Sequence, residues 1–433
     1  MQTSAERRPT RIAIAGFGTV GQSVARLMLD LAPRELELVA ICNRDVARKR
    51  VDWIPARVRW TERIEDLLGD DVDVVVELIG GRTPAEEWIR RALDAGKSVV
   101  TANKQVIAHA GPALLEAAAR AGSRVRFEAA VAGGVPVVRA IEHGLAGDRL
   151  TRVAGILNGT CNYILSRMER DGVGFRNALA EAQALGFAEA DPSQDIEGFD
   201  AQAKLAILAH VALHAHVNAG DIQARRIDTI DAVDFQYAGQ IGCTIRQIAW
   251  AERTADAATI RAAVGPALVP LGSPLASVRG SENLVMLRGQ YGGETTFGGL
   301  GAGGEPTAVA VLSDLLAIAR EAGPHVTRSA TVRAEVTSEF ESPYYIRFTV
   351  ADRPGIIATL AAVFARHAIN IDAVLQRPGF PEGRRPFVVS LDPASSSAID
   401  HAMREIAAFD FHEVPPVALP VLSSLVPGGG DEA

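Results

Sequence analysis

The chain has 433 residues, 48% of them hydrophobic and 22% charged, so it is long enough to form about two to four domains with buried cores. Its net charge of −8 includes no long acidic or basic run, which argues against a nucleic-acid partner and a polybasic membrane patch. No stretch reaches the roughly 18 apolar residues that cross a bilayer, and the three separated cysteines form no disulfide or zinc pattern. We therefore expect a cytoplasmic protein with small-molecule ligands.

Residues 1–145 are predicted to form a doubly wound, Rossmann-type α/β domain. Strand-like runs alternate there with amphipathic helical stretches, the rhythm of a parallel sheet. The runs are RIAIAG, LELVAIC, VDVVVELIG, SVVTAN and RVRFEAAV.

A glycine-rich motif, GFGTVG, follows the first of these strands and opens a helix. It consists of Gly16, Phe17, Gly18, Thr19, Val20 and Gly21. In this context the backbone can approach a pyrophosphate at a helix N-terminus, so we predict dinucleotide binding. The alternative is a tight turn without a ligand.

The end of the second strand, ICNRD, bears on the choice of cofactor. Asn43 stands where NAD sites often place an acidic residue that binds the ribose, and Arg44 follows it. An arginine there can pair with a 2′-phosphate, which favours NADP over NAD. Alternatively, Arg44 is a solvated loop residue.

The rest of the chain divides into two further predicted domains. Residues 146–325 combine helices at 175–186 and 199–216 with short strands such as RVAGIL and ENLVMLRG, which indicates an α+β substrate-binding and dimerisation domain. Residues 344–423 follow the order strand, helix, strand, strand, helix, strand, which is typical of a ferredoxin-like module.

Lys204 lies in an apolar helix, one turn after Asp200. The chain contains only four lysines among 44 basic residues, and an amine can release a proton that a guanidinium retains. A buried ammonium beside a carboxylate could therefore donate a proton to a carbonyl oxygen. The alternative is an ordinary salt bridge on a helix face. A second lysine, Lys104, follows SVVTAN at the carboxyl edge of the predicted sheet, where such folds bind ligands.

Several long segments of the chain resemble the homoserine dehydrogenase family, in the order and spacing of that family. They are GFGTVG, TANK, EAAVAGGVP, GILNGTCNYIL, GFAEADPSQDIEGFDAQAKLAIL and GLGAGGEPTAVAVLSDL, and the resemblance covers roughly residues 10 to 320. The resemblance implies NAD(P)-dependent interconversion of L-homoserine and L-aspartate 4-semialdehyde, on the route from aspartate to threonine and methionine. Because the first strand begins so early, we expect no kinase domain before it.

The resemblance also implies roles for individual residues. Lys204 would donate the proton to the aldehyde oxygen, and Lys104, near the nicotinamide, would assist. Glu189 and Asp200 would hold the substrate, whose ammonium group needs buried carboxylates, while Asn158 and Thr160 would line the same pocket. The remaining cofactor contacts would come from Thr101, Gly301 and Gly303, although the two glycines could equally belong to a flexible turn.

A monovalent cation, usually sodium, is a further feature of this family. The matching segment supplies an oxygen cage from Glu128 and the carbonyls of Val131, Gly133 and Val135, and oxygen suits a hard cation. From the residues alone, Glu128 could equally be a carboxylate at the sheet edge.

The C-terminal module, YYIRFTVADRPGIIATLAAVFARHAINIDAV, resembles an ACT domain. Such modules bind amino acids between paired copies, which implies L-threonine as an effector near Asp352, Gly355 and Asn370. The alternative is a domain that only dimerises. We expect a homodimer or homotetramer. The alternative to an enzyme is a non-catalytic, NADP-linked amino-acid sensor; a 2-hydroxy-acid dehydrogenase would instead need an Arg/His/Glu set.

Overall fold

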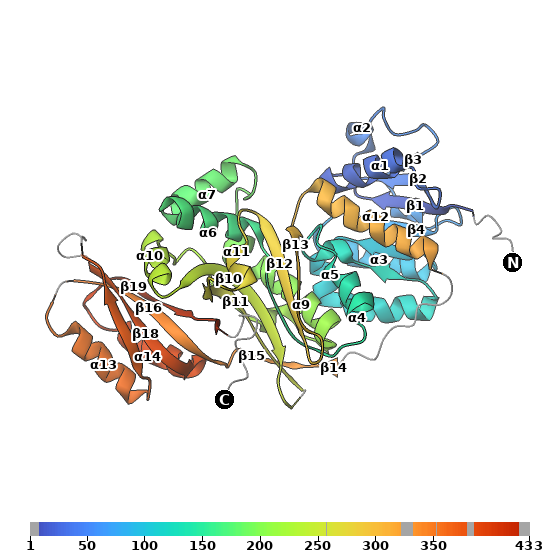
Figure 1. The fold of residues 1–433 in the computed structure, drawn as a ribbon. Helices are drawn as coiled ribbons and strands as arrows, with labels where there is room; N and C mark the ends of the chain where they lie inside the picture. Colours follow the sequence, from blue (N-terminus) through green and yellow to red (C-terminus); the bar gives the residue numbers. More distant parts are fainter. Residues whose placement is uncertain (1–7, 257, 322–331, 352, 379–384, 424–433) are drawn as a thin grey trace. The chain divides into compact units, whose positions relative to one another are not determined.

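The computed structural model describes residues 8–256, 258–321, 332–351, 353–378 and 385–423 (Figure 1). The chain forms two compact units, and each contains segments that are distant in sequence. The first unit combines residues 1–153, 203–219 and 283–334, and the second combines 154–202, 220–282 and 335–433. Strand β7 (Leu150–Ile156) and helix α9 (Phe199–Leu213) each run from one unit into the other.

The first unit contains a parallel six-stranded sheet with the order β3-β2-β1-β4-β5-β6, as expected for a Rossmann-type domain. Its strands are β1 (Thr10–Ala15), β2 (Leu36–Cys42), β3 (Arg59–Thr61), β4 (Val74–Glu77), β5 (Ser98–Thr101) and β6 (Val125–Arg126). The predicted strand RVRFEAAV is therefore too long: β6 ends at Arg126, and Glu128–Ala130 form a 3₁₀ turn.

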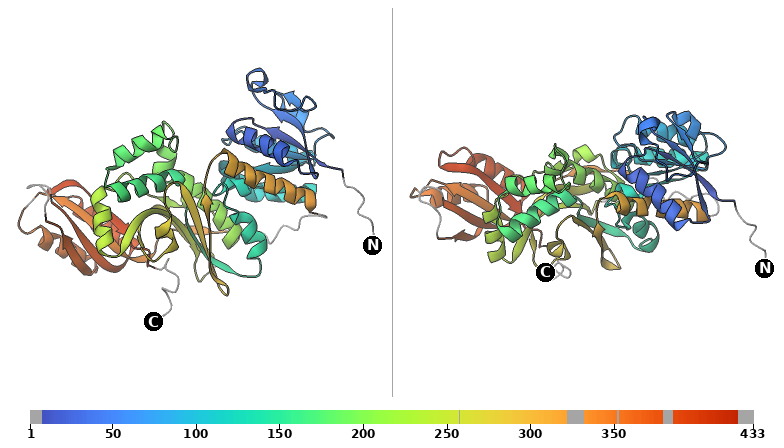
Figure 2. Two further views of the ribbon diagram at one scale, coloured as in Figure 1. Left: turned by 45° about the horizontal axis from the view of Figure 1, so that its top comes forward. Right: turned by 90° about the horizontal axis from the view of Figure 1, so that it is seen from above.

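Helices cover both faces of this sheet, so its strands are apolar almost throughout. On one face α1 (Thr19–Leu31) packs beside α12 (Gly304–Arg320), which the chain adds from much later in the sequence (Figures 1 and 2). Helices α3 (Ala85–Asp94) and α4 (Lys104–Ala121) pack together and contribute nothing to that core. The short helix α2 (Val46–Lys49) follows β2, and the 3₁₀ turn η1 (Ile64–Leu67) follows β3.

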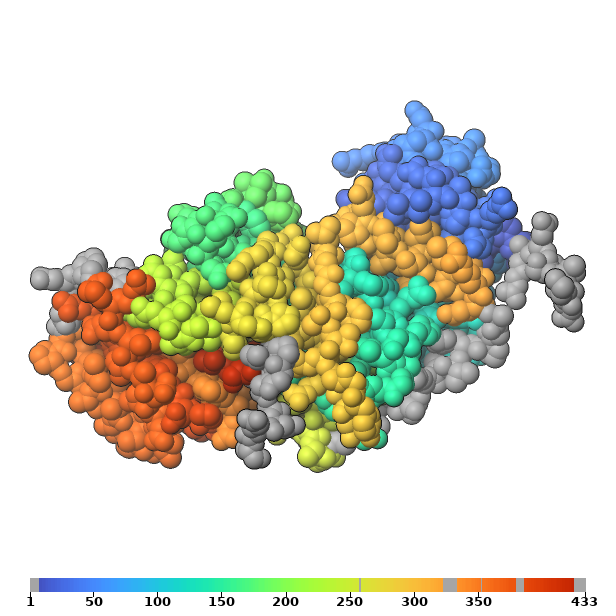
Figure 3. Space-filling model, in the orientation of Figure 1, coloured from blue at the N-terminus to red at the C-terminus, as the bar shows by residue number. Residues whose placement is uncertain are grey.

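The remaining elements of the first unit are short turns and strands together with two longer strands, β12 (Glu282–Gly289) and β13 (Gly293–Leu300). The short elements are α5 (Val137–Arg139), a π-helical turn at Ala140–Gly144, β8 (Ala215–His216) and β14 (Val332–Arg333). Strand β13 lies next to β12 and exposes every second side chain towards its end, so it forms part of the surface visible in Figure 3.

The second unit begins with helices and a long hairpin. The helices are α6 (Gly159–Asp171), α7 (Phe175–Ala184), α8 (Ser193–Ile196), α10 (Ala232–Gln240) and α11 (Pro274–Ser277). Strands β10 (Cys243–Arg253) and β11 (Thr259–Pro270) pair antiparallel over their whole length, and β11 also pairs with β9 (Gln223–Ala224) and β15 (Glu335–Thr337). The expectation of only short strands in this region was wrong, because this Ala-rich hairpin lacks a clear two-residue alternation.

The ferredoxin-like module completes the second unit, and the structure confirms its predicted element order. The elements are β16 (Glu341–Val350), α13 (Ile356–Arg366), β17 (Ile371–Gln376), β18 (Arg385–Ser395), α14 (Ser396–Ile406) and β19 (His412–Pro420). The sheet has the order β17-β18-β16-β19 and is antiparallel. Helices α13 and α14 cover one face of it (Figure 1).

The other face of that sheet is joined to α10 by a buried ionic network. Asp234, fully buried on α10, accepts hydrogen bonds from Arg347 Nε and the Tyr345 hydroxyl, both at 2.7 Å. Burial raises the pKa of Asp234, whereas the Arg347 guanidinium opposes this rise. Removing either partner would leave a buried charge unpaired, so the module is an integral part of the second unit. Within the described ranges, no helix is long and apolar enough to cross a membrane.

Candidate active site

The GFGTVG motif forms a close turn between β1 and α1, as predicted. Gly16 has φ = +103°, and a Cβ at Gly21 would lie 2.2 Å from the carbonyl oxygen of Gly16, so the turn closes only with glycine at these two positions. A Cβ at Gly18 would meet nothing within 4 Å. Its surroundings therefore leave room beside the N-terminus of α1, which is where a pyrophosphate binds in such turns.

Phe17 can contact a cofactor at this turn only through its main chain, because its side chain points into the core. Its ring is fully buried and packs against Trp53 and Trp60, and its N–H donates to Asn43 Oδ1 at 3.1 Å. The next residue, Arg44, is exposed and makes no ion pair with any described residue. Its guanidinium is thus available to an external anion at the end of β2.

The glycines of GAGGEP bring the start of α12 to the same turn. A Cβ at Gly304 would lie 3.0 Å from Thr19 Cγ2, so the first turns of α12 and α1 touch. Gly303, with φ = +122°, is the N-cap of α12. Gly301 is explained by packing within the protein, because a Cβ there would lie 2.1 Å from Asn283 Cγ.

Lys104 is the first residue of α4, at the carboxyl edge of the sheet. Asn103 caps this helix by accepting from the Val106 N–H at 3.2 Å. Thr101 is fully buried, and its hydroxyl donates to Glu77 at 2.6 Å and accepts from the Asn103 N–H at 2.9 Å. The Thr101 hydroxyl is therefore committed within the protein, which leaves its main chain for any contact with a cofactor.

In the second unit, one amide holds two carboxylates together. The Asn158 Nδ2 group donates to Asp195 Oδ1 at 2.6 Å and to Asp200 Oδ2 at 2.8 Å. Asn158 is 4% exposed and Asp200 is 5% exposed. The Asn158 Oδ1 atom also caps α6 by accepting from the Cys161 N–H at 2.8 Å, which fixes the amide orientation. Such a site favours a cation that can balance the two carboxylates.

Asp195 was not among the predicted substrate ligands, and Glu189 occupies a different environment from the one expected. Glu189 is exposed rather than buried, and its main-chain oxygen accepts from Gln183. Thr160 donates its hydroxyl to the Phe187 carbonyl at 2.7 Å, so it holds the segment that leads to Glu189. The recurrence of aspartate in DPSQDIEGFD, five residues before Asp200, was the available signal for Asp195.

Lys204 and Asp200 both lie on α9, one helical turn apart. Their side chains are buried, with residue exposures of 9% and 5%. This burial argues against the solvated salt bridge that was the alternative interpretation of the pair. An amine and a carboxylate held out of bulk water can take part in proton transfer, provided that a substrate reaches them.

Glu128 organises the loop for which a cation cage was predicted. Its two carboxylate oxygens accept from the Val138 and Arg139 N–H groups, each at 2.8 Å, and its own N–H donates to Asp314 Oδ2 at 2.9 Å. Burial raises the pKa of Glu128, and burial together with nearby Glu128 raises the pKa of Asp314 to about 7. The Asp314 Oδ1 atom is buried and has no hydrogen-bond partner among the described residues.

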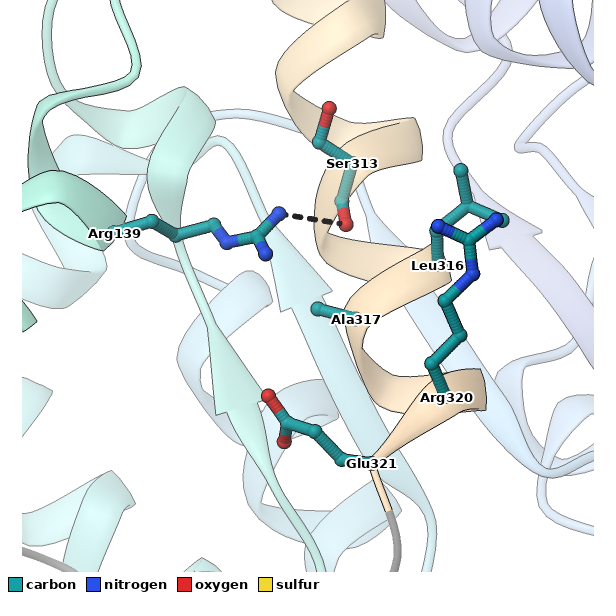
Figure 4. Close-up of a pocket in the computed structure, with 6 residues that line it drawn as sticks. All are labelled: Arg139, Ser313, Leu316, Ala317, Arg320 and Glu321. Atoms are coloured by element: carbon teal, nitrogen blue, oxygen red, sulfur yellow. Dashed lines mark hydrogen bonds between the residues drawn. The ribbon is translucent and has the colours of Figure 1, made fainter. Parts of the chain in front are cut away.

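A small cavity of about 320 Å³ lies beside this loop, between α5 and α12 (Figure 4). Arg139 reaches across it and donates to the Ser313 carbonyl at 3.3 Å. The other charged residues that line it, Arg320 and Glu321, are paired with Glu35 and Arg126. None of the predicted site residues lines this cavity, and we assign it no ligand. Within the described ranges, no three His, Cys, Asp or Glu residues gather as metal ligands.

Comparison with known proteins places these features in one family. The NAD-binding domain of homoserine dehydrogenase matches residues 16–128, the homoserine dehydrogenase catalytic domain matches 136–316, and the ACT domain matches 344–408. The homoserine dehydrogenase of Mycobacterium tuberculosis is 41% identical over 414 residues, which cover 92% of this chain and 94% of that protein.

Solved structures agree with this result. A homoserine dehydrogenase from Thiobacillus denitrificans matches with a TM-score of 0.87 and 33% identity, over 95% of this chain and 98% of that one. A hyperthermophilic archaeal homoserine dehydrogenase in complex with NADPH matches with a TM-score of 0.62 and 25% identity, over 73% of this chain and 99% of that one.

Proposed function

The chain belongs to the homoserine dehydrogenase family, and we propose that it interconverts L-homoserine and L-aspartate 4-semialdehyde with a nicotinamide cofactor. The observation that carries this proposal is that Asn158 holds buried Asp200 and half-buried Asp195 together, with buried Lys204 one turn beyond Asp200. Two carboxylates suit the ammonium of an amino acid, and an amine suits proton exchange with its oxygen. We place the reaction in the branch from aspartate to threonine and methionine.

A bound nicotinamide would supply or accept the hydride in this mechanism, and the residues of the chain position the substrate and move the proton. Asp195 and Asp200 hold the substrate ammonium, and Asn158 fixes the separation of the two carboxylates. Lys204 Nζ donates a proton to the aldehyde oxygen during reduction and recovers it from the alcohol during oxidation. Lys104 assists near the nicotinamide. Thr160 lines the substrate pocket. Glu189, whose side chain is exposed in this structure, contacts the bound substrate.

We propose NADP as the preferred cofactor. The exposed Arg44 at the end of β2 supports this choice, because it can pair with a 2′-phosphate, and Asn43 provides no carboxylate for a ribose. The relative that was solved with NADPH is further support. The contacts would come from the GFGTVG main chain, Lys104, Thr101 and the start of α12.

We also propose a monovalent cation, sodium, at the loop from Glu128 to Val135. Buried Glu128, the nearby orphaned oxygen of Asp314 and the main-chain carbonyls make a hard oxygen environment that suits such an ion. The ion would stabilise the loop without taking part in proton or hydride transfer.

For the C-terminal module we propose regulation by L-threonine. Of the predicted effector residues, Gly355 caps α13 with φ = +92° and Asn370 is exposed just before β17, while Asp352 lies outside the described residues. The matching ACT model supports amino-acid binding. A module that only pairs subunits remains the second candidate, and a homodimer or homotetramer fits both. We propose a cytoplasmic location, in agreement with three buried free cysteines.

The functional division of the chain proposed here is 1–145 for the cofactor, 146–325 for substrate and dimerisation, and 344–423 for the effector. The ranges of the three matching family models support this division. These three ranges are assigned by function, whereas the two compact units are defined by which residues pack together.

Lys204→Ala should lower kcat by about 100-fold or more while the affinity for NADPH stays within about twofold, because the proton donor is lost and the cofactor turn is untouched. Lys204→Arg is the matched control: it keeps the positive charge but cannot readily release a proton, so it should be equally impaired. Reduction of NADP on addition of homoserine gives kcat, and NADPH fluorescence gives affinity. A near-normal kcat in either variant would refute the proton-donor role. Wild-type protein that binds NADPH but never reduces NADP would instead be a sensor.

Arg44→Ala should lower kcat/KM for NADP about tenfold and leave the value for NAD nearly unchanged, since only NADP carries the 2′-phosphate. Arg48→Ala, at a neighbouring exposed arginine on α2, is the control and should alter neither value appreciably. If Arg44→Ala left the ratio of kcat/KM for NADP to kcat/KM for NAD unchanged, the 2′-phosphate would have to be recognised by other residues.

Asn370→Ala should raise the threonine concentration for half-inhibition about tenfold or more without altering uninhibited kcat. A point substitution is preferable to deletion of the module, because deletion would remove both hydrogen-bond partners of Asp234 and expose the core that α10 shares with the module. Arg404→Ala, on α14, is the control within the same domain. Threonine inhibition that is equal in the wild type and Asn370→Ala would place the effector elsewhere, and a wild type that ignores threonine would favour a pairing role.

A further inference from the structure

Glu77 is a buried carboxylate to which the proposed mechanism gives no role. It ends β4, whose sequence VVVE is otherwise apolar, and it is 1% exposed. Burial raises its pKa, although the groups that donate hydrogen bonds to it oppose the rise. A polar group at such a position is costly unless every oxygen is engaged, so its partners indicate what it does.

The partners of Glu77 come from the two loops at the carboxyl edge of the sheet. Its Oε2 atom accepts from the Thr101 hydroxyl at 2.6 Å, at the end of the neighbouring strand β5. Its Oε1 atom accepts from the Ile79 N–H at 2.9 Å and, more weakly, from Asn103 Nδ2 at 3.5 Å. One side chain therefore connects the loop after β4 with the loop after β5.

The first of these connections reaches Lys104. The Thr101 hydroxyl that donates to Glu77 also accepts from the Asn103 N–H, and Asn103 is the N-cap of the helix that begins at Lys104. Asn103 Nδ2 further donates to the Gly81 carbonyl at 2.6 Å. The backbone that carries Lys104 is thus held in place by hydrogen bonds that lead back to Glu77.

The second connection reaches the glycine-rich turn. Glu77 holds the Ile79 N–H, and the Leu78–Ile79 peptide is the surface against which Gly16 packs: a Cβ at Gly16 would lie 2.7 Å from the Leu78 oxygen and 2.9 Å from the Ile79 nitrogen. The Leu78 N–H also donates to the Ala15 carbonyl at 2.8 Å, which keeps this peptide in the sheet.

We infer that Glu77 is a positioning residue that sets the placement of Lys104 relative to the glycine-rich turn. Its carboxylate oxygens are engaged by the Thr101 hydroxyl, the Ile79 N–H and the Asn103 amide, so it acts through these groups. This inference rests on the proposed role of Lys104 near the nicotinamide. Small displacements of a catalytic group cost large factors in rate, so loss of Glu77 should affect turnover more than folding.

The test is a double-mutant cycle with Lys104. Glu77→Ala should lower kcat about tenfold or more and weaken NADPH binding several-fold, while KM for homoserine changes less than about threefold. In a Lys104→Ala background the same substitution should lower kcat by less than about twofold, because the group that it positions is already absent.

The matched control is Asp73→Asn, at the opposite end of the same strand. Asp73 directly precedes β4, and its carboxylate accepts from the Arg11 N–H at 2.8 Å. Like Glu77, it therefore binds a main-chain N–H at one end of β4, but at the opposite edge of the sheet. It should leave kcat and NADPH affinity within about twofold of wild type at temperatures where the protein is folded.

Two results would overturn the inference: a Glu77→Ala enzyme with kcat within twofold of wild type, or a loss of kcat that persists undiminished in the Lys104→Ala background. If Glu77→Ala does not fold, Glu77→Gln, which keeps the side-chain volume, is judged by the same two criteria. A wild type without homoserine-dependent activity would refute the proposed function instead, and NADPH affinity in the Glu77 variants would still report on the glycine-rich turn.

Discussion

Two carboxylates that share one amide nitrogen are the constraint around which the second unit is organised. Asn158 can hold Asp195 and Asp200 together only because its own oxygen is fixed by the start of α6. Two carboxylates that share one donor, of which Asp200 is buried and Asp195 half-buried, form a site that suits a cation. The substrate of a homoserine dehydrogenase brings such a cation as its ammonium group. The same α9 that carries Asp200 also carries Lys204, so in the proposed mechanism ammonium recognition and proton transfer would depend on one helix.

The first unit uses a related device, in which buried carboxylates bind main-chain N–H groups at loop ends. Glu77 ties the loops after β4 and β5, and Glu128 ties the loop before α5, while Asp314 on α12 receives the N–H of Glu128 itself. Each of these acids stabilises irregular backbone where the chain leaves the sheet. This rigidity matters because three of the six residues in the GFGTVG turn are glycines, which contribute no side chain to hold the backbone in shape.

The sequence predicted the elements whose signals are local. GFGTVG between a strand and a helix, and the element order of the ACT module, depend on neighbouring residues and are found as expected. Asn158 and Asp200 were identified through the family resemblance and do meet in space. Glu77 could not be recognised, because its partner Thr101 is 24 residues away and a glutamate that ends an apolar strand is equally compatible with solvent exposure. For Glu189 only the expected burial was wrong: the resemblance implied a buried ligand, but its side chain is exposed after α7, and its contact with the substrate stays a prediction. Burial is a property of the packed chain, which residue spacing does not report.

We propose that Asn158 holds Asp195 and Asp200 for the ammonium group of the substrate. Comparing kcat/KM for L-homoserine with that for 4-hydroxybutanoate, which lacks only the amino group, tests it most directly. We expect the analogue to be poorer by about a thousandfold or more, because it lacks the ammonium group for which the two carboxylates are proposed to be placed. Comparable kcat/KM values for the two alcohols would show that the carboxylates do not bind the ammonium group.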